Sequence, residues 1–174
     1  MSWFLLIMYQ VAWWACALSG PFNVPLLGPL VVLSQLVFWL WMIKNPLQEF
    51  VLLLVMSLVG IVIDSILLDK GILIVPAHFF LKPPFPPFWL IALWISFAVG
   101  IRSCLQKLSQ KYILACLLGA IAGPIAYRGG MALEALVLSP QAYWILSITW
   151  AGLFPILLKI SDLYPIHIKF QSPS

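Results

Sequence analysis

Six long apolar runs dominate the chain and restrict the environments in which it can fold. They cover residues 3–18, 26–43, 47–68, 88–108, 111–138 and 141–160. The chain is 64% hydrophobic and only 8% charged, whereas a soluble domain carries roughly 25% charged residues. About 20 apolar residues suffice to cross a bilayer as a helix. The sequence therefore predicts an all-α, polytopic membrane protein with about six transmembrane helices. They form one domain over residues 1–160, and a polar tail follows over 161–174.

Two segments between or within these runs leave alternatives. Ala15-Cys16-Ala17 resembles a signal-peptide cleavage site, but no basic residue precedes the first run, which favours an uncleaved helix. The connection over 72–87 is apolar and also rich in proline, which forbids a regular helix. Because non-helical backbone cannot face lipid tails, this connection is expected in the interface or over the mouth of the bundle.

The fifth run contains the densest pattern of small residues. Two series recur every four positions, and they are Ala115, Gly119, Gly123 and Ala122, Ala126, Gly130. That spacing places small side chains on one helix face, where another helix can approach closely. Pro124 removes a backbone hydrogen bond and predicts a kink. These features predict a tightly packed helix at the centre of the bundle.

Polar residues inside the apolar runs are the candidate functional residues. Asp64 and Ser65 lie in the third run, and Tyr127, Arg128 and Glu134 lie in the fifth. A charge in hydrocarbon costs at least about 2.5 kcal/mol, so such residues face protein or water. Asp64 and Arg128 have comparable expected depths. They are predicted either to neutralise each other structurally or to line one polar site with Ser65, Tyr127 and Glu134.

Two further charged residues are predicted to lie outside the candidate site. Arg102 lies near the end of the fourth run and is expected to extend to water, and Glu49 is expected to be an ordinary interfacial charge. Of the basic residues near the ends of the runs, six fall on the side of both termini and two on the other. This asymmetry predicts cytoplasmic termini.

Several function classes find no support in the sequence. The nine Lys and Arg residues are scattered, so no nucleic-acid surface is expected. Three cysteines without a CxxC pair do not indicate a disulfide framework or a metal site. No hydrolase, zinc-protease, P-loop or dinucleotide motif is present, so no cofactor is expected and nothing favours an enzyme.

Three short segments resemble a known family. They are Gly-x-x-x-Asp-Ser over residues 60–65, Gly-Pro-x-Ala-Tyr-x-x-Gly over 123–130, and Leu-Gly-Pro-Leu over 27–30. Together they are similar to the domain-of-unknown-function 2878 family, over about residues 4–160. The resemblance implies a small bacterial inner-membrane protein without an established activity. Arg102 departs from the family pattern, in which Asn is frequent near this position.

The resemblance also carries an implication about function. Genes of the family tend to lie beside lipid-modifying genes, which implies a role in membrane lipid metabolism or envelope stress. The expected partners are membrane lipids and a lipid-modifying enzyme. The alternatives are a small secondary transporter with Asp64 and Arg128 at its site, and an intramembrane enzyme.

Overall fold

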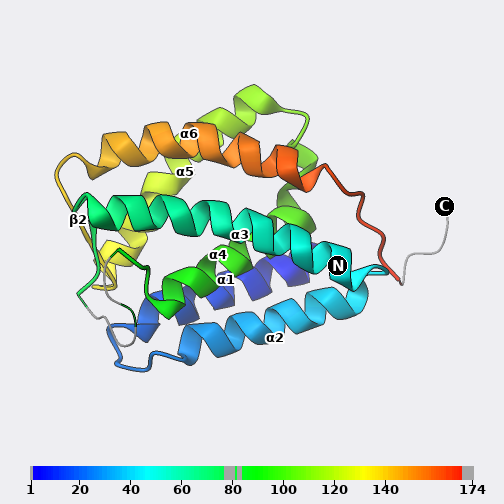
Figure 1. Ribbon diagram of the computed structural model, residues 1–174, viewed down its shortest axis with the longest axis horizontal. Helices are drawn as coiled ribbons and strands as arrows, with labels where there is room; N and C mark the ends of the chain where they lie inside the picture. The colour runs from blue at the N-terminus through cyan, green and yellow to red at the C-terminus, as the bar shows by residue number, and fades with distance from the viewer. Residues whose placement is uncertain (1, 77–80, 82–83, 170–174) are drawn as a thin grey trace.

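A computed structural model of the chain describes residues 2–76, 81 and 84–169. It shows six helices, of which α2, α3 and α6 run along the long axis of the molecule, while α5 is steeply inclined to them (Figure 1). Their bounds are α1 Ser2–Ser19, α2 Leu27–Met42, α3 Pro46–Asp69, α4 Phe88–Gly100, α5 Tyr112–Ala132 and α6 Ala142–Ser161. A π-helical turn, η1 (Ile101–Leu105), and a 3-10 turn, η2 (Gln106–Leu108), extend α4.

The helices have the length and composition of membrane-spanning segments. Four of the segments, α3, α4 with its two extending turns, α5 and α6, are long and apolar enough to cross a membrane. The apolar helices α1 and α2 are shorter. The predicted fold class, an all-α polytopic membrane protein with six helices, is confirmed. The predicted bounds agree to within about one residue except at the end of the fifth helix, and the fourth run, 88–108, coincides with α4 and its two turns.

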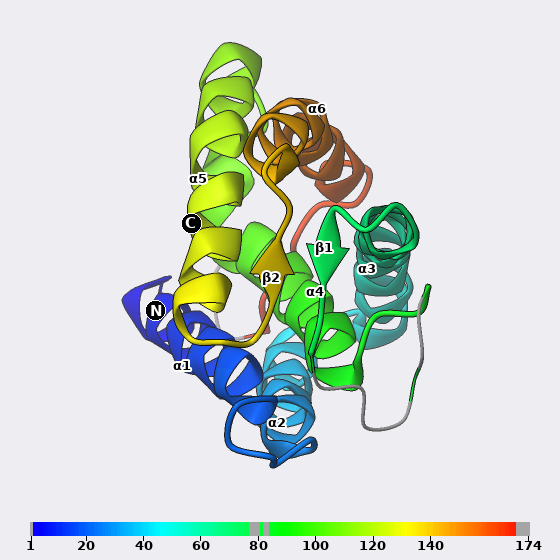
Figure 2. The same cartoon turned by 90° about the vertical axis from the view of Figure 1, so that its left-hand side faces the viewer.

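The centre of the bundle is formed by α4, which packs against α1, α2 and α3 (Figure 2). Helix α5 packs mainly against α6, at the edge of the bundle. The expectation that the fifth helix occupies the centre is therefore wrong. Its small residues do allow close packing, mainly against α6. The rest of its surface carries exposed apolar side chains such as Ile113, Ile121 and Ile125, as expected for lipid contact.

Three helices end in the same hydrogen-bonded cap. The residues at its left-handed position are Asn23, Gly71 and Glu134, with φ of 58°, 64° and 61°. In each case the next amide donates to a carbonyl five residues earlier, for example Ala135 to Gly130 at 3.0 Å, which satisfies the open helix end. This cap ends α5 six residues before the predicted end of the fifth helix at Leu138.

Beyond the cap, the apolar residues continue as a strand rather than as helix. Strand β2 (Val137–Leu138) pairs antiparallel with β1 (Leu73–Ile74), as Figure 2 shows. The α3–α4 connection is thereby fixed to the α5–α6 connection, and Leu73 and Val75 are buried. Of the proline-rich segment predicted over 72–87, residues 77–80 and 82–83 lie outside the described residues.

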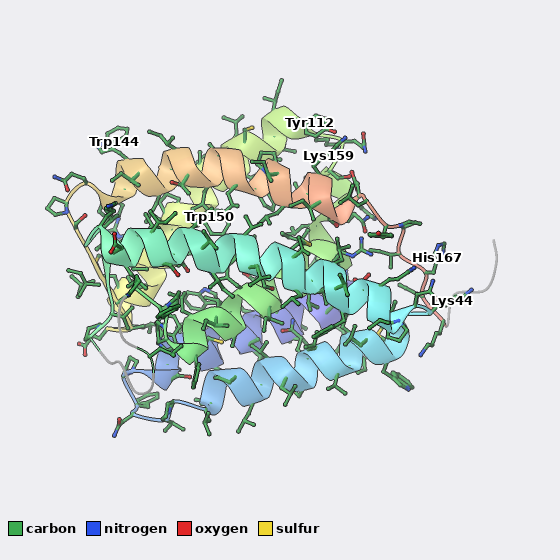
Figure 3. The ribbon with its side chains drawn as sticks, viewed as in Figure 1. Lys44, Tyr112, Trp144, Trp150, Lys159 and His167 are labelled. Atoms are coloured by element: carbon green, nitrogen blue, oxygen red, sulfur yellow. The ribbon has the colours of Figure 1, made fainter. Side chains whose placement is uncertain are left out.

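The described part of the C-terminal tail lies against the α2–α3 connection. Ile168 forms a β-bridge with Ile43, and the Lys44 amide donates to the His167 carbonyl at 2.8 Å. Lys44, Lys159 and His167 gather at the end of the bundle that carries both termini (Figure 3).

Candidate functional site

Two tryptophans stack at the contact between α4 and α6. The rings of Trp94 and Trp150 lie 5.4 Å apart between centroids, with an interplanar angle of 9°. Figure 3 shows Trp150 directed from α6 into the bundle, whereas Trp144 projects away from it and is 76% exposed. Phe97 contacts both rings of the stack edge-on, at 5.9 Å from Trp94 and 5.3 Å from Trp150. The stack links the α1–α4 part of the bundle to the α5–α6 pair.

Glycines make room for the stack on both sides. A Cβ added at Gly60 of α3 would lie 2.1 Å from the Trp94 ring. On α5, a Cβ at Gly123 would lie 2.3 Å from the Trp150 ring, and one at Gly119 would lie 2.2 Å from the Trp150 carbonyl oxygen. No side chain fits at these distances. The first glycine of each of two of the segments that resemble the family, Gly60 and Gly123, therefore accommodates Trp94 or Trp150.

The polar residues of the same segments meet beside the stack. Trp94 donates its indole N–H to Asp64 Oδ2 at 2.6 Å, and Tyr127 donates its hydroxyl to Asp64 Oδ1 at 2.5 Å. Asp64 is completely buried and Tyr127 is 7% exposed. Each carboxyl oxygen thus has a donor, as a buried carboxylate requires. Both donors are neutral groups; Tyr127 is one of the predicted site residues, and Trp94 is not.

The other predicted site residues do not join Asp64. Arg128 is exposed, so the expected Asp64–Arg128 pair is not formed. The reason is helical geometry, because Arg128 follows Tyr127 by about 100° around α5 and faces outward. Ser65 donates to the Ile61 carbonyl of its own helix at 2.8 Å. Glu134 is exposed at the α5 cap.

The predicted helix-packing residues of the fifth run are buried, but they do not all contact the same segment. Ala115, Gly119 and Gly123 are buried. Gly130, also buried, lies near Leu136 of the following connection. Helix α5 continues through Pro124, which is buried within it.

A cavity of about 360 Å³ lies between α1, α4, α5 and α6. Every residue that lines it is apolar, aromatic or glycine. Tyr127 and Trp94, which hold Asp64, form part of the wall, together with Trp150 and Phe97. Along α4 and η1 the lining extends from Trp89 to Leu105, which is about 24 Å at 1.5 Å per residue. The cavity is therefore long, and its volume is within the range of about 300–1,000 Å³ typical of small-molecule sites.

The cavity opens sideways, between helices. Leu118, Ala122 and Ala126 of α5 line it and are also exposed. These residues lie in the middle of a membrane-spanning helix, where the surrounding solvent is lipid hydrocarbon. Trp13 of α1 lines the cavity and comes near Gly129 of α5, where an added Cβ would lie 3.1 Å from its ring. The opening is thus bordered by apolar side chains of α5, a helix long and apolar enough to cross a membrane.

A second polar cluster at the other end of α4 was not predicted. Arg102 and Glu49 form a bidentate pair, with Nε–Oε1 at 2.8 Å and Nη2–Oε2 at 2.6 Å. Their residues are 1% and 4% exposed. The expectations that Arg102 extends to water and that Glu49 is an interfacial charge are therefore wrong. Burial is tolerated because each charge has its partner and further hydrogen bonds.

This cluster fastens the C-terminal segment to the bundle. Trp39 of α2 donates its indole N–H to Glu49 Oε1 at 2.9 Å. Arg102 Nη1 donates to the carbonyls of Ser161 at 2.6 Å and Tyr164 at 3.0 Å. One signal could have indicated the pair. Glu49 lies in the first turn of α3, and Arg102 lies in η1, directly after α4, so opposite charges fall at the same end of two neighbouring antiparallel helices.

A comparison with known families gives one match. Residues 2–156 match the family described as Protein of unknown function (DUF2878), which is nearly the whole chain. The chain belongs to this family. The resemblance inferred from the three short segments is thereby confirmed. Neither a curated protein nor a solved structure shows significant similarity to the chain.

In this DUF2878 protein the segments that carry the resemblance have a physical role. The first places Gly60 and Asp64 one turn apart, against the ring and the N–H of Trp94. The second places Gly123 against the Trp150 ring and Tyr127 on Asp64. Both therefore shape one wall of the cavity. Asp64 stabilises this wall and does not itself line the cavity.

Proposed function

We propose that the protein is an integral membrane protein that binds a membrane lipid, with an apolar lipid chain in the lateral cavity. The cavity itself carries the proposal: its lining is apolar apart from a few polar atoms of aromatic side chains, it is long, and it opens between helices. Its length of about 24 Å exceeds one leaflet's share of a hydrocarbon core about 30 Å thick. A chain from one leaflet can therefore lie along α4 without leaving the bilayer.

The polar groups favour this function over transport. Asp64, the residue that a transporter was expected to use, is completely buried and has both oxygens hydrogen-bonded. Arg128, its expected partner, faces outward. A coupling site requires polar groups that a solute or ion can reach. The accessible lining instead suits a hydrocarbon ligand, because burying apolar surface in an apolar cavity needs no polar partner.

The protein is placed by this proposal in the bacterial inner membrane, with both termini in the cytoplasm. The exposed basic side chains Lys44 and Lys159 lie at the end that carries the termini (Figure 3), and Lys169, also exposed, is held there by its amide, which donates to the Met42 carbonyl; this supports the orientation. A lipid-binding protein in that membrane suits an accessory role beside a lipid-modifying enzyme, in lipid metabolism or in the response to envelope stress.

Retention of lipid by variants of α5 tests the proposal. Ala126 lines the cavity and is exposed at its opening, so Ala126→Phe should fill the cavity without displacing the packed core. Ile125 is 63% exposed and does not line the cavity, so Ile125→Phe is the matched control. Lipid that remains bound after extraction in mild detergent is measured by native mass spectrometry. Ala126→Phe should lose most of the lipid that the wild type and the control retain. Equal retention by all three would refute the proposal.

A further inference from the structure

We infer that the cavity binds a prenyl quinone, a flat ring with two carbonyl oxygens on an apolar tail, and that Tyr9 donates its hydroxyl to one of those oxygens. This inference rests on the proposed lipid-binding function and specifies the class of lipid. It assigns the tail to the long apolar part of the cavity and the ring to the aromatic part beside Tyr9.

Tyr9 offers the cavity an unused hydroxyl. It lines the cavity from α1, contacts the Phe97 ring at 6.4 Å and makes no hydrogen bond to the described part of the chain. The other tyrosine of the lining, Tyr127, already donates to Asp64. Trp94 is likewise engaged through its indole N–H. Tyr9 is therefore the lining hydroxyl that remains available to a ligand, beside the indole N–H of Trp89, which also has no partner in the described part of the chain.

The depth of Tyr9 decides which ligand oxygen it can meet. Tyr9 lies seven residues after Ser2, the first residue of α1, which is about 10 Å along the helix. Its ring lies against α4, where a Cβ at Gly100 would be 3.3 Å away. A plain acyl chain has no oxygen along its length that could accept from a hydroxyl in an apolar cavity. A lipid with a carbonyl oxygen below the head-group region satisfies it.

The walls around Tyr9 suit a flat ring. Phe97 lies between Tyr9 and Trp150, 5.3 Å from the latter in an edge-to-face arrangement. Trp150 also contacts Tyr127 edge-on at 6.3 Å. Aromatic side chains attract planar π-systems through offset-stacked or edge-on contacts. Combined with a hydrogen-bond donor, these contacts distinguish a quinone ring from a saturated chain.

Quenching of tryptophan fluorescence by decylubiquinone tests the inference, because Trp94 and Trp150 form the adjoining wall. The purified full-length wild type should show saturable quenching. Tyr9→Phe removes one neutral hydrogen bond and should raise the Kd about three- to tenfold. Tyr112→Phe is the control, because Tyr112 is exposed at the start of α5 and does not line the cavity. Its Kd should equal that of the wild type.

Two further probes separate the inference from the proposed function. Palmitate and 12-hydroxystearate are tested as competitors that reduce the quenching by decylubiquinone. Neither should bind as tightly as decylubiquinone itself. If Tyr9→Phe leaves the Kd for decylubiquinone unchanged, or if Tyr9 affects only 12-hydroxystearate, the quinone inference is wrong. The same holds if the wild type shows no saturable quenching while it still retains phospholipid that Ala126→Phe loses. In that case the proposed lipid-binding function is supported, and the assignment of the ligand as a quinone is contradicted.

Discussion

Trp94 and Asp64 are joined by a hydrogen bond of 2.6 Å from the indole N–H to Oδ2, and Gly60, one turn before Asp64, lies against the same indole ring. One helix thus receives both the face and the polar edge of a single tryptophan. This explains why a glycine and an aspartate occur four residues apart in an apolar helix. It also ties the buried carboxylate to the shape of the cavity, because Trp94 forms part of its wall.

The fit of Trp94 against Gly60 predicts a large effect of one methyl group. Gly60→Ala should destabilise the protein by about 1–3 kcal/mol, because the new Cβ overlaps the ring and the core must shift. Gly152→Ala is the control, since a Cβ there meets no atom within 4 Å and alanine favours a helix. Thermal unfolding in detergent should show a lowered midpoint for the first variant only. Equal midpoints would contradict the packing of Trp94 described above.

Asp64 is predicted to act through its two neutral donors and not through Arg128. Asp64→Leu should destabilise by about 1–3 kcal/mol for each donor left without a partner, Trp94 and Tyr127. Arg128→Gln should change stability by no more than about 0.5 kcal/mol, because Arg128 is exposed. Unfolding midpoints of the two variants provide the comparison. A loss of stability in Arg128→Gln as large as in Asp64→Leu would contradict this prediction and support an ion pair between Asp64 and Arg128.

The buried pair of Glu49 and Arg102 predicts a double-mutant signature. Arg102→Leu alone should cost about 3–5 kcal/mol, because Glu49 is left charged and buried without its partner. The double variant with Glu49→Leu should recover part of that loss. The exposed pair of Asp69 and Lys70 is the control, and Lys70→Gln should cost less than about 1 kcal/mol. Additive losses in the double variant would argue against the pair.

The cap of α5 predicts a stabilising substitution. Glu134 has a φ of 61°, a conformation that costs an L-residue roughly 1–2 kcal/mol relative to glycine. Glu134→Gly should therefore raise the unfolding midpoint. The reverse change at the equivalent cap of α3, Gly71→Ala, should lower it, and there strain acts alone because no atom lies within 4 Å of the added Cβ. Opposite signs for the two variants are the expected result, and a shift in the same direction would contradict it.

Hydropathy predicted most of the helices because their bounds coincide with changes in composition. Pro46 begins α3, and the 88–108 run was found to its last residue. The predicted range of the fifth helix extends too far because Val137 and Leu138 are as apolar as the helix before them. Its end depends on a left-handed residue, and Glu134 gives no sequence signal for that conformation, whereas Gly71 does.

The candidate site was only partly predictable. The burial of Asp64 follows from its position in an apolar helix. Of its two donors, Tyr127 is among the residues predicted beside Asp64, whereas Trp94 is not, because a neutral indole N–H in an apolar run gives no charge signal. The glycines of α5 indicated close packing, but not that the close neighbour is Trp150. The lateral cavity arises from how four helices diverge, which no single segment encodes.

The central claim, that a lipid chain occupies the lateral cavity, is tested most directly by photo-cross-linking in membranes. A phospholipid with a diazirine on its acyl chain is incorporated, and the labelled residues are mapped by mass spectrometry. We predict labelling of Leu93, Phe97 and Ala122 that excess unlabelled lipid suppresses, and unsuppressed labelling of the outward-facing Ile121. Labels confined to Ile121 and its exposed neighbours, unaffected by competitor, would contradict the claim.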